Sequence, residues 1–369
     1  MEPFRENDRF AARGAVGTAA RPKVSGARGI ARKRPSHVRI VSAGAYLPEQ
    51  RVSSADIEDR IEEASPGFRI RRGLVKTHTG IDFRHYSKAD EQASDLATRA
   101  AAQALARANA TASDVDLLIF GSASQDLIEP ATAHIVAAKL GLRCPVFDVK
   151  NACNSWLNGM QVATSLLASG AYRTALVVTG ECPSRAVRFQ VEGWKDLFAG
   201  AAGYTMGDAG AAVFLAYDPE SEGIFFQDFR ASSEHWSIAT LPGGGTMHPR
   251  GDEFSYFQGD GTRLRDAFVS LGPDFIRDAL AATGTRYEDF RRIFCHQVTG
   301  PFLEIFLRST EIPREKIVLT VPELGNIASA TMPTQLALAM ERGWVGPGDD
   351  VMFAGLGGGL SVGVMLARL

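Results

Sequence analysis

The sequence predicts an α/β fold made of two similar halves, and two observations predict it. From His37 onward, apolar strand-like runs alternate with helix-like runs, a pattern typical of a mainly parallel sheet with helices on its faces. After residue 260 the order recurs, and the closing segment repeats the glycines and the small apolar strand of residues 207–216. We therefore expect the halves to meet at a central cleft, where strand ends from both contribute to one site.

The first half carries five strand signals and four helix signals. Strands are expected at VRIVSAGAYLP (38–48), DLLIFGSAS (116–124), PVFDVKNA (145–152), TALVVTGEC (174–182) and the buried part of YTMGDAGAAVFLAYDP (204–219). Helices are expected at SADIEDRIEEA (54–64), SDLATRAAAQALARANA (94–110), ATAHIVAAKLGL (131–142) and directly after Cys153.

The second half repeats this order. A long helix is expected at 262–284, a strand ending at His296, a helix at 301–310, a strand at 316–321, a turn at Asn326, a further helix, and the closing segment 349–369.

Composition narrows the class of protein. The chain has 369 residues, 45% of them apolar, and a formal net charge of −2, which gives no overall reason to expect a nucleic-acid partner. The four cysteines show neither CxxC spacing nor grouping with other metal ligands, so we expect no metal site and a reducing, cytoplasmic location. No segment has the roughly 18 uninterrupted apolar residues of a membrane span.

Residues 1–36 are the exception to this charge balance. Nine Arg or Lys residues stand there against three acids, without a regular apolar period. We interpret the segment as a disordered basic tail outside catalysis. An Arg-rich transit peptide or a weak contact with an anionic surface stays open, whereas a secretory signal would need an apolar stretch of about 7–15 residues.

Cys153 is the leading candidate for a catalytic residue. It follows the strand PVFDV and stands just before a helix, whose N-terminus offers unpaired N–H groups and about half a positive charge. Such a position favours the thiolate and predicts a lowered pKa. The alternative is a buried cysteine that behaves as a small hydrophobe.

Two further polar residues stand at strand-to-helix junctions. His296 ends the strand RRIFC, and Asn326 lies in the turn of ELGNIASATMP. Taken alone, His296 fits a core histidine with its hydrogen bonds satisfied, and Asn326 fits a turn residue that tolerates left-handed geometry.

Six separated motifs, in order, resemble those of the thiolase superfamily and, within it, the β-ketoacyl synthase III type of condensing enzyme. They are TGIDFRH (79–85), FDVKNAC (147–153), MGDAGAAVFL (206–215), HQV (296–298), GNIASATMP (325–333) and GLGGGLSVG (355–363). The resemblance covers residues 37–369 and implies a five-layered αβαβα fold, with an N-terminal half at 37–218 and a C-terminal half at 219–369.

The resemblance also implies roles for individual residues. Cys153 would accept an acyl group from coenzyme A or an acyl carrier protein, and His296 and Asn326 would stabilise the enolate of the second thioester. The N–H groups of Cys153 and Gly358 would form the oxyanion hole. Arg84 would meet the nucleotide end of coenzyme A, with a surface salt bridge as the alternative. No metal or redox cofactor is implied.

Two positions depart from the common synthase III pattern. Pro301 stands where the family's histidine motif usually has an arginine, so the usual cofactor-entry contact is not expected. Glu129 stands where an aromatic residue is usual, and it resembles the glutamate of the branch that condenses two long acyl-thioesters head to head for olefin or β-lactone pathways. There it would cross a homodimer interface and act as a base, with a pKa raised by burial. The alternative is an exposed glutamate before Pro130.

The expected function is a non-decarboxylative Claisen condensation of two acyl-CoAs by an acyltransferase. The alternative is a decarboxylative synthase III that joins an acyl primer to a malonyl-thioester. A biosynthetic thiolase is disfavoured because GLGGGLSVG lacks a second cysteine, and a non-catalytic subunit is disfavoured because Cys153, His296 and Asn326 are all present.

The stretch 229–257 is expected to shape the acyl channel or its lid, with Trp236 binding substrate. Cys144, Cys182 and Cys295 are interpreted as core thiols, and His85 and His134 as structural or exposed.

Overall fold

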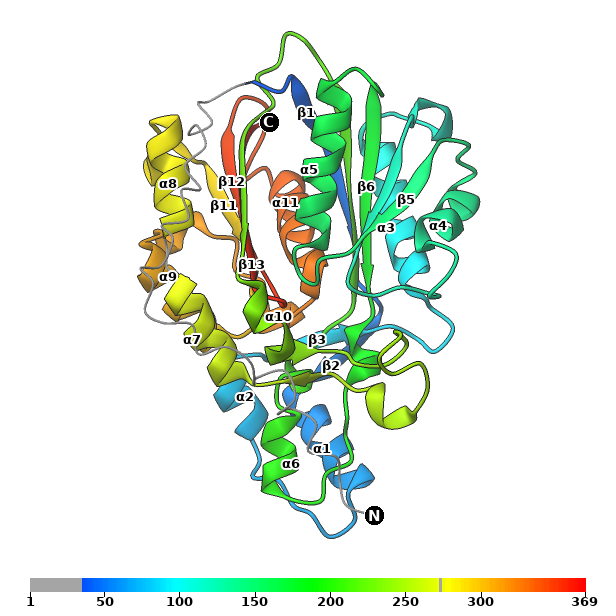
Figure 1. The fold of residues 1–369 in the computed structure, drawn as a ribbon, viewed down its shortest axis with the longest axis vertical. Helices are drawn as coiled ribbons and strands as arrows, with labels where there is room; N and C mark the ends of the chain where they lie inside the picture. The colour runs from blue at the N-terminus through cyan, green and yellow to red at the C-terminus, as the bar shows by residue number, and fades with distance from the viewer. Residues whose placement is uncertain (1–34, 272–273) are drawn as a thin grey trace, which may run out of the picture. The chain divides into compact units, whose positions relative to one another are not determined.

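The computed structural model describes residues 35–271 and 274–369, and its first large sheet takes all its strands from the N-terminal half (Figure 1). The strand order is β1 (Val38–Tyr46), β7 (Ala209–Tyr217), β6 (Thr174–Glu181), β4 (Leu118–Gly121) and β5 (Val146–Val149). β4 pairs in parallel with β5 and β6, whereas β7 is antiparallel to both of its neighbours. β5 therefore forms one edge of this sheet.

The second large sheet takes all its strands from the C-terminal half. Its order is β11 (Arg292–Cys295), β12 (Asp350–Gly357), β13 (Ser361–Arg368) and β8 (Ile224–Ala231). β11 and β12 are parallel, and the other two pairings are antiparallel. The expectation of mainly parallel sheets is therefore wrong. A connection as short as Gly358–Leu360 between β12 and β13 allows only an antiparallel pair.

Helices and sheets alternate in five layers (Figure 1). Helices α3 (Ala93–Arg107) and α4 (Thr132–Leu140) cover the outer face of the first sheet, and α8 (Asp274–Thr283) and α9 (Gly300–Thr310) cover the outer face of the second. Between the two sheets lie α5 (Ser155–Ala168) and α11 (Thr331–Glu341).

The core of the central layer is apolar and takes residues from both halves. Trp156 and Met160 of α5 and Met332 of α11 are completely buried there, together with Phe353 of β12. The rings of Trp156 and Phe353 lie 5.7 Å apart, centroid to centroid, at a tilt of 54°. Burying side chains of this size is favourable by about 1.5–3 kcal/mol each, so this layer joins the halves firmly.

The two halves repeat the same strand order. β1, β7, β6 and β4 of the first sheet correspond in position to β8, β13, β12 and β11 of the second. The inferred internal repeat is thus present in the topology. Residues 218–223 connect the last strand of the first sheet, β7, to the first strand of the second sheet, β8. Both sheets belong to a single compact unit that contains all the described residues.

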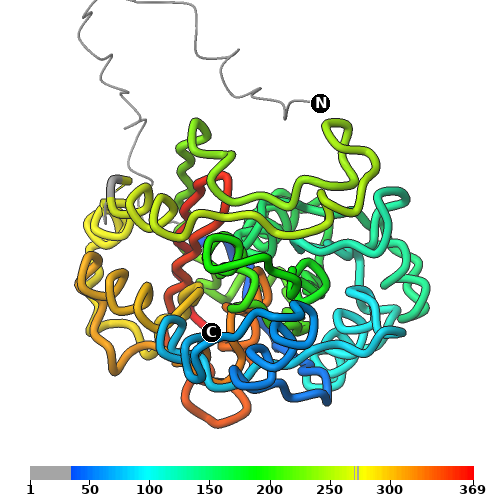
Figure 2. Tube along the Cα trace, turned by 90° about the horizontal axis from the view of Figure 1, so that it is seen from below, coloured from blue at the N-terminus to red at the C-terminus, as the bar shows by residue number. Residues whose placement is uncertain are grey.

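Smaller elements lie at the end of the sheets where β4 and β5 finish. They are β2 (Gln50–Ser53), α1 (Ser54–Ala64), α2 (Leu74–Thr79), β3 (Phe83–Tyr86), α6 (Trp194–Ala199), β9 (Ala239–Thr240), β10 (Gln258–Gly259), α7 (Gly261–Leu271) and α10 (Val321–Leu324). Short 3₁₀ turns span Ala112–Asp114, Pro183–Ala186, Gly203–Thr205, Ser233–Ile238, Asp252–Phe254, Tyr287–Asp289, Arg314–Lys316 and Ala328–Ala330. Figure 2 views this end directly and shows the α1–α2 segment and the α6 segment lying together over it.

Two expected elements differ from the structure. The segment 262–284 holds two helices, α7 and α8, and residues 272–273 between them lie outside the described part. Residues 1–34 of the predicted tail also lie outside it. The segment 316–321 is not a regular strand, since only Ile317 bridges Ile293. The side chain of Gln297 replaces a neighbouring strand there, because its Oε1 accepts from the N–H groups of Thr320 and Val321, each at 3.0 Å.

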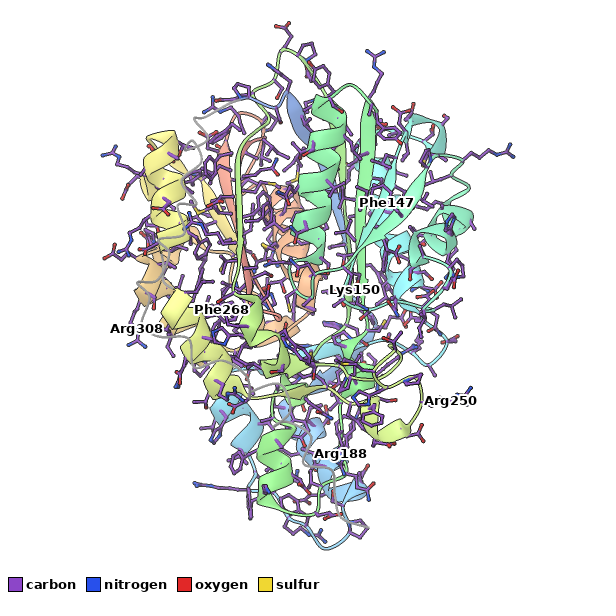
Figure 3. All side chains as sticks on the ribbon, in the orientation of Figure 1. Phe147, Lys150, Arg188, Arg250, Phe268 and Arg308 are labelled. Atoms are coloured by element: carbon purple, nitrogen blue, oxygen red, sulfur yellow. The ribbon has the colours of Figure 1, made fainter. Side chains whose placement is uncertain are left out.

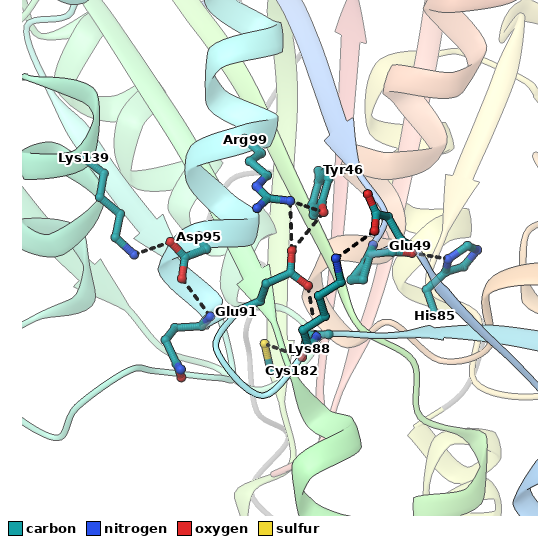
Figure 4. A network of polar contacts seen from close by, with 12 residues as sticks. Tyr46, Glu49, His85, Lys88, Glu91, Asp95, Arg99, Lys139 and Cys182 are labelled. Atoms are coloured by element: carbon teal, nitrogen blue, oxygen red, sulfur yellow. Dashed lines mark hydrogen bonds and ion pairs between the residues drawn. The ribbon is translucent and has the colours of Figure 1, made fainter.

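A polar network fixes the loop between β3 and α3 (Figure 4). Glu91 accepts from the Tyr46 hydroxyl at 3.0 Å and pairs with Arg99 at 2.9 Å, and Lys88 pairs with Glu49 at 2.8 Å. His85 contacts the Pro48 carbonyl through Nδ1 at 2.6 Å, which agrees with its expected structural role. In the described ranges, no helix has the length and apolar character needed to cross a membrane.

Candidate active site

Cys153 lies in a tight turn between β5 and α5, as predicted. Ala152 before it has a φ of 47°, in the left-handed region that a non-glycine residue seldom adopts. Ser155 holds the turn, since its Oγ accepts from the N–H of Asn151 at 2.7 Å and donates to the carbonyl of Ala152 at 2.6 Å. The sulfur is therefore carried on a fixed piece of backbone at the start of the helix.

The surroundings of the Cys153 thiol oppose its ionisation. Burial, followed by the negative charge of Glu181, raises the pKa of Cys153 to about 12, and hydrogen bonds from the backbone of Gly358 and of Cys153 itself act in the other direction. The expected lowering of the pKa of Cys153 is therefore wrong, because desolvation and the charge of Glu181 outweigh the backbone hydrogen bonds to the sulfur. The contact with Gly358 nevertheless brings together the two residues that were expected to form the oxyanion hole.

The strands on either side of the β12–β13 connection contact the start of α5 directly. Asn154, which is completely buried, donates from Nδ2 to Ser361 Oγ at 2.9 Å and to the Ser361 carbonyl at 3.1 Å. A Cβ atom on Gly355 would lie 2.2 Å from Asn154 Oδ1, so only glycine allows this close approach. The position of Gly358 relative to Cys153 is thus set by contacts between the two halves.

His296 follows β11 directly, and its N–H extends the β11–β12 ladder to the Ala354 carbonyl at 3.1 Å. Its side chain is buried, and Nδ1 has no hydrogen-bond partner in the described part of the chain. Burial lowers the pKa of His296 to about 4, against the opposing effect of a hydrogen bond with the Ala328 backbone. The imidazole is therefore uncharged at neutral pH.

Asn326 lies in the turn before α11, and two backbone hydrogen bonds hold it. Its N–H donates to the Thr205 carbonyl at 2.8 Å, and its own carbonyl accepts from the N–H of Gly207 at 3.1 Å. Its Oδ1 accepts from the N–H of Ala328 at 3.1 Å, whereas no hydrogen bond of Nδ2 is found within 35–271 and 274–369. An amide donor is thus left available in this turn.

A chain of contacts brings Cys153, His296 and the Asn326 turn to one site. Ser329 of that turn donates to Glu181 at 2.5 Å, and the charge of Glu181 acts on the Cys153 thiol. His296 meets the same turn at Ala328. The structure therefore gathers the three predicted catalytic residues around residues 326–330.

Glu129 is exposed, in the loop between β4 and α4, next to the exposed side chains of Leu127 and Ile128. Lys150 Nζ donates to Gln125 Oε1 at 2.9 Å and so attaches this loop to the turn after β5; Figure 3 labels Lys150 beside that strand end. The burial that was expected to raise the pKa of Glu129 is absent in the single chain.

The expected contact between Arg84 and a nucleotide is wrong. Arg84 on β3 is 0% exposed, and its guanidinium donates to Ser54 Oγ at 3.1 Å and to the Tyr204 carbonyl at 3.0 Å. Burial lowers the pKa of Arg84 from its usual value. An ideal Cβ on Gly207 or on Gly325 would lie 3.0 or 3.3 Å from Arg84 Cβ, so the residue packs directly behind the backbone that holds Asn326.

Trp236 is 54% exposed in the 3₁₀ turn Ser233–Ile238, so it is not enclosed in a channel of the single chain. The segment around it borders the site, because the N–H of Ser232 donates to the Leu360 carbonyl at 2.8 Å. Its role in substrate binding stays a prediction. Pro301 lies in the first turn of α9, where its missing N–H is not needed.

The other cysteines and His134 follow their structural interpretation, except that Cys144 is less buried than expected. Cys182 and Cys295 are buried, Cys144 is half-buried, and His134 is exposed. Among the residues that the structure describes, no three His, Cys, Asp or Glu side chains are grouped as a metal site.

Glu181 is a residue of the site that sequence reasoning did not select. Glu181 is 0% exposed at the end of β6. In the sequence, it is marked only by its position as an acidic residue directly after the uncharged run TALVVTG. A buried carboxylate in that position requires hydrogen-bond donors around it, and the structure supplies them.

Comparison with known proteins now identifies the family. The family model "3-Oxoacyl-[acyl-carrier-protein (ACP)] synthase III" matches residues 147–234, and the model of its C-terminal part matches residues 280–369. The chain is 31% identical to the β-ketoacyl-[acyl-carrier-protein] synthase III of Fusobacterium nucleatum subsp. nucleatum over 342 residues, which cover 90% of this chain and 98% of the relative.

Solved structures agree with this assignment. A crystal structure of OleA from Xanthomonas campestris matches with a TM-score of 0.81 and 27% identity, over 90% of this chain and 98% of OleA. The 3-oxoacyl-[acyl-carrier-protein] synthase III of Aquifex aeolicus matches with a TM-score of 0.78 and 25% identity, over 90% of this chain and all of that chain (100%). The predicted five-layered α/β fold is thereby confirmed. The chain belongs to the β-ketoacyl-[acyl-carrier-protein] synthase III family of acyl-condensing transferases, which have the thiolase fold.

Proposed function

We propose that this acyltransferase condenses two acyl-CoA molecules head to head, without decarboxylation, to a β-keto thioester. The observation that carries the proposal is Glu129, a carboxylate on an exposed loop where the family's common pattern has an aromatic residue, in a chain whose fold matches OleA. One of the matching OleA structures, 28% identical with a TM-score of 0.79, contains bound lauric acid and lauroyl-CoA.

The first step is acyl transfer to Cys153. The thiol attacks the thioester carbonyl, the carbon–sulfur bond of the donor breaks, and the thiol proton passes through neutral His296 to the leaving coenzyme A thiolate. The N–H groups of Cys153 and Gly358 hold the oxyanion of the tetrahedral intermediate, and each such donor contributes about 3 kcal/mol to its stabilisation. A neutral His296 supports this step, because only the unprotonated nitrogen can accept the proton.

The second step forms and uses an enolate. The second acyl-CoA presents its thioester carbonyl to Asn326 Nδ2 and to His296, and a carboxylate removes its α-proton. The enolate carbon attacks the acyl-Cys153 carbonyl, and the carbon–sulfur bond to Cys153 breaks. The proton that the carboxylate removed then returns to the sulfur, which restores both the thiol and the carboxylate. These steps use only the two thioesters and protein side chains, so no metal or redox cofactor is included.

The base of the second step is Glu129 of a partner subunit in a homodimer. In the single chain Glu129 is exposed beside Leu127 and Ile128, which are 52% and 72% exposed. Two neighbouring apolar side chains with this exposure favour a protein partner. Burial of this loop against a second copy would remove the carboxylate from water and bring it to the partner's acyl site.

Strand β5 supports a second copy as that partner. It is an edge of the first sheet, and its side chains are half-buried or exposed, including Phe147 (Figure 3). An unpaired edge strand can extend its sheet by pairing with a copy of itself across a two-fold axis. Such pairing would place the neighbouring loop that carries Glu129 at the interface.

The second candidate is a decarboxylative synthase III. It is favoured by the matching family models and by the relatives from Fusobacterium and Aquifex. In this reaction the enolate forms by loss of carbon dioxide from a malonyl-thioester, so Glu129 has no chemical role.

Incubation with lauroyl-CoA alone, and then with malonyl-thioester added, separates these reactions by free thiol release and product mass. We expect a β-keto product from lauroyl-CoA alone and its loss in Glu129→Gln, with acylation of Cys153 retained. Product only with malonyl-thioester, at an equal rate in Glu129→Gln, would contradict the proposal and establish the second candidate.

A mixture of variants tests whether Glu129 acts across the interface. Cys153→Ala and Glu129→Gln subunits are each expected to be inactive as homodimers. Random mixing makes about half of the dimers hybrid, each with one intact site, so about a quarter of wild-type activity should return. Activity that stays at the level of the separate variants would show that both residues must come from one chain.

A further inference from the structure

His296 stands at the end of an edge strand. Among the described strands β11 neighbours only β12, and the N–H of His296 donates to the Ala354 carbonyl on that side. Successive residues of a strand direct their N–H and C=O groups to opposite edges, so those of Cys295 face away from β12. Two residues earlier, Ile293 faces the same way and bridges Ile317. Cys295 is 0% exposed, and its backbone groups therefore need partners other than water.

The carboxamide of Gln335 supplies those partners. Its Oε1 accepts from the N–H of Cys295, and its Nε2 donates to the carbonyl of Cys295, both at 3.0 Å. The second N–H of the same amide donates to Thr320 Oγ1 at 3.2 Å. Gln335 is completely buried, and its side chain thus takes the place of a neighbouring strand at Cys295.

A second buried carboxamide holds the other side of His296. Gln297 Nε2 donates to the Val318 carbonyl at 2.8 Å, and its Oε1 accepts from the N–H of Thr320 at 3.0 Å. The Thr320 hydroxyl joins the two amides, because it accepts from Gln335 and donates to Gln297 Oε1 at 3.3 Å. The backbone before and after His296 is therefore fixed by side chains rather than by a strand.

Gln335 also connects this backbone to the element that carries Asn326. It lies on α11, and the 3₁₀ turn Ala328–Ala330 that follows Asn326 runs directly into the first residue of that helix, Thr331. The imidazole of His296 has no comparable anchor of its own, since Nδ1 has no hydrogen-bond partner within the described ranges. A functional histidine is usually oriented by a group bonded to its other ring nitrogen, so the placement of this ring depends on the backbone.

We propose that Gln335 is a positioning residue, which sets the place of His296 relative to Asn326 by holding Cys295 to α11. The inference rests on the proposed function, in which these two side chains donate to the same thioester carbonyl. Two donors stabilise one developing oxyanion only when both are within hydrogen-bond distance of it. A displacement of the β11 end by about 1 Å therefore costs about 10- to 100-fold in rate. All three hydrogen bonds of Gln335 are to the protein, so the affinity for substrate does not depend on it.

The test is a double-mutant cycle between Gln335→Met and His296→Ala, read as the rate of β-keto product formation by the full-length enzyme. Methionine keeps the length of the side chain and removes all three hydrogen bonds. With His296 present, we expect Gln335→Met to lower kcat about 10- to 100-fold, with KM for lauroyl-CoA within about twofold. In the His296→Ala background the same change should lower the rate less than about twofold, because the imidazole that Gln335 positions is gone.

Equal losses in both backgrounds would show a general defect of the fold and would overturn the inference. Thr334→Val is the matched control, because Thr334 precedes Gln335 on α11 and is 0% exposed, and its hydroxyl has no hydrogen-bond partner in the described part of the chain. This variant should keep the wild-type kcat and KM. A loss in Thr334→Val as large as that in Gln335→Met would also contradict the proposal.

A measurement without turnover keeps the inference testable if Gln335→Met does not fold or if the wild type forms no product. Gln335→Glu keeps the shape of the side chain and the acceptor for the Cys295 N–H, and it removes the amide donors. In enzyme with isotopically labelled histidine, the NMR signal of the His296 ring is assigned by its loss in His296→Ala. We expect this signal to shift in Gln335→Glu and to stay in place in Thr334→Val, and an unshifted signal in Gln335→Glu would overturn the inference.

Failure of the proposed function looks different from failure of this inference. Product would then form only with malonyl-thioester, and the cycle between Gln335 and His296, measured with that substrate, would still show the dependence of one residue on the other.

Discussion

Cys153 and Asn326 occupy corresponding positions in the two halves of the molecule. Cys153 precedes α5 and Asn326 precedes α11, and these two helices lie side by side between the sheets (Figure 1). Each turn also contains a non-glycine residue with positive φ, Ala152 at 47° and Ala328 at 45°. The internal repeat therefore brings the proposed nucleophile from one half and an amide donor from the other to the same end of the central layer.

Replacing Cys153 should abolish covalent acylation. In Cys153→Ala, incubation with lauroyl-CoA should give no mass increase of the enzyme, and condensation should fall by at least about 1,000-fold because no acyl-enzyme forms. Cys144→Ala, at another half-buried cysteine, is the control and should retain acylation. Acylation that persists in Cys153→Ala would place the nucleophile elsewhere.

Gly355→Ala should damage the site by overpacking. The added Cβ would lie 2.2 Å from Asn154 Oδ1, so the turn that carries Cys153 must shift, at a cost of about 1–3 kcal/mol in the free energy of unfolding. Gly346→Ala, where nothing lies within 4 Å of the new Cβ, should change stability by less than about 0.5 kcal/mol. Urea unfolding and acylation rates of the two variants measure the difference, and equal stability would show that the β12–β13 connection adapts.

Arg84→Met should lower turnover rather than the affinity for coenzyme A. The change leaves the buried Tyr204 carbonyl without its donor beside the Thr205–Asn326 hydrogen bond, so we expect a lower kcat and a loss of about 1.5–3 kcal/mol in stability. Arg51→Met, at an exposed arginine on the neighbouring strand β2, is the matched control. A raised KM for acyl-CoA with kcat unchanged would favour the nucleotide contact that the burial of Arg84 argues against.

His296 should make the protein less stable in mild acid. The unfolded chain protonates this imidazole below pH about 6.5, whereas burial lowers its pKa to about 4 in the folded protein. Between these values the unfolded state binds more protons, so the free energy of unfolding decreases as pH falls, by about 2 kcal/mol from pH 7.5 to pH 5.

Urea unfolding at the two pH values tests this prediction, with His296→Gln losing that part of the pH dependence. His134→Gln, at an exposed position on α4, should keep the wild-type profile. Identical profiles in His296→Gln and the wild type would assign the acid sensitivity to other groups.

The order of elements, the repeat and the three residues Cys153, His296 and Asn326 were determined by the sequence, because apolar periodicity and motif spacing are local properties of the chain. The direction of the strands and the irregular conformation of residues 316–321 were decided by tertiary contacts. Short connections make β12 and β13 antiparallel, and the Gln297 side chain takes the place of a strand partner.

The electrostatics of the site were also decided only by the tertiary structure. Desolvation depends on everything packed around a group, so no local pattern indicates that the pKa of Cys153 is raised rather than lowered, or that Arg84 is buried behind Asn326. Glu181 gathers donors from segments that lie 57 and 148 residues away along the chain. The residues proposed to perform chemistry were thus selected from the sequence, whereas the charges and contacts around them arise from packing between the two halves.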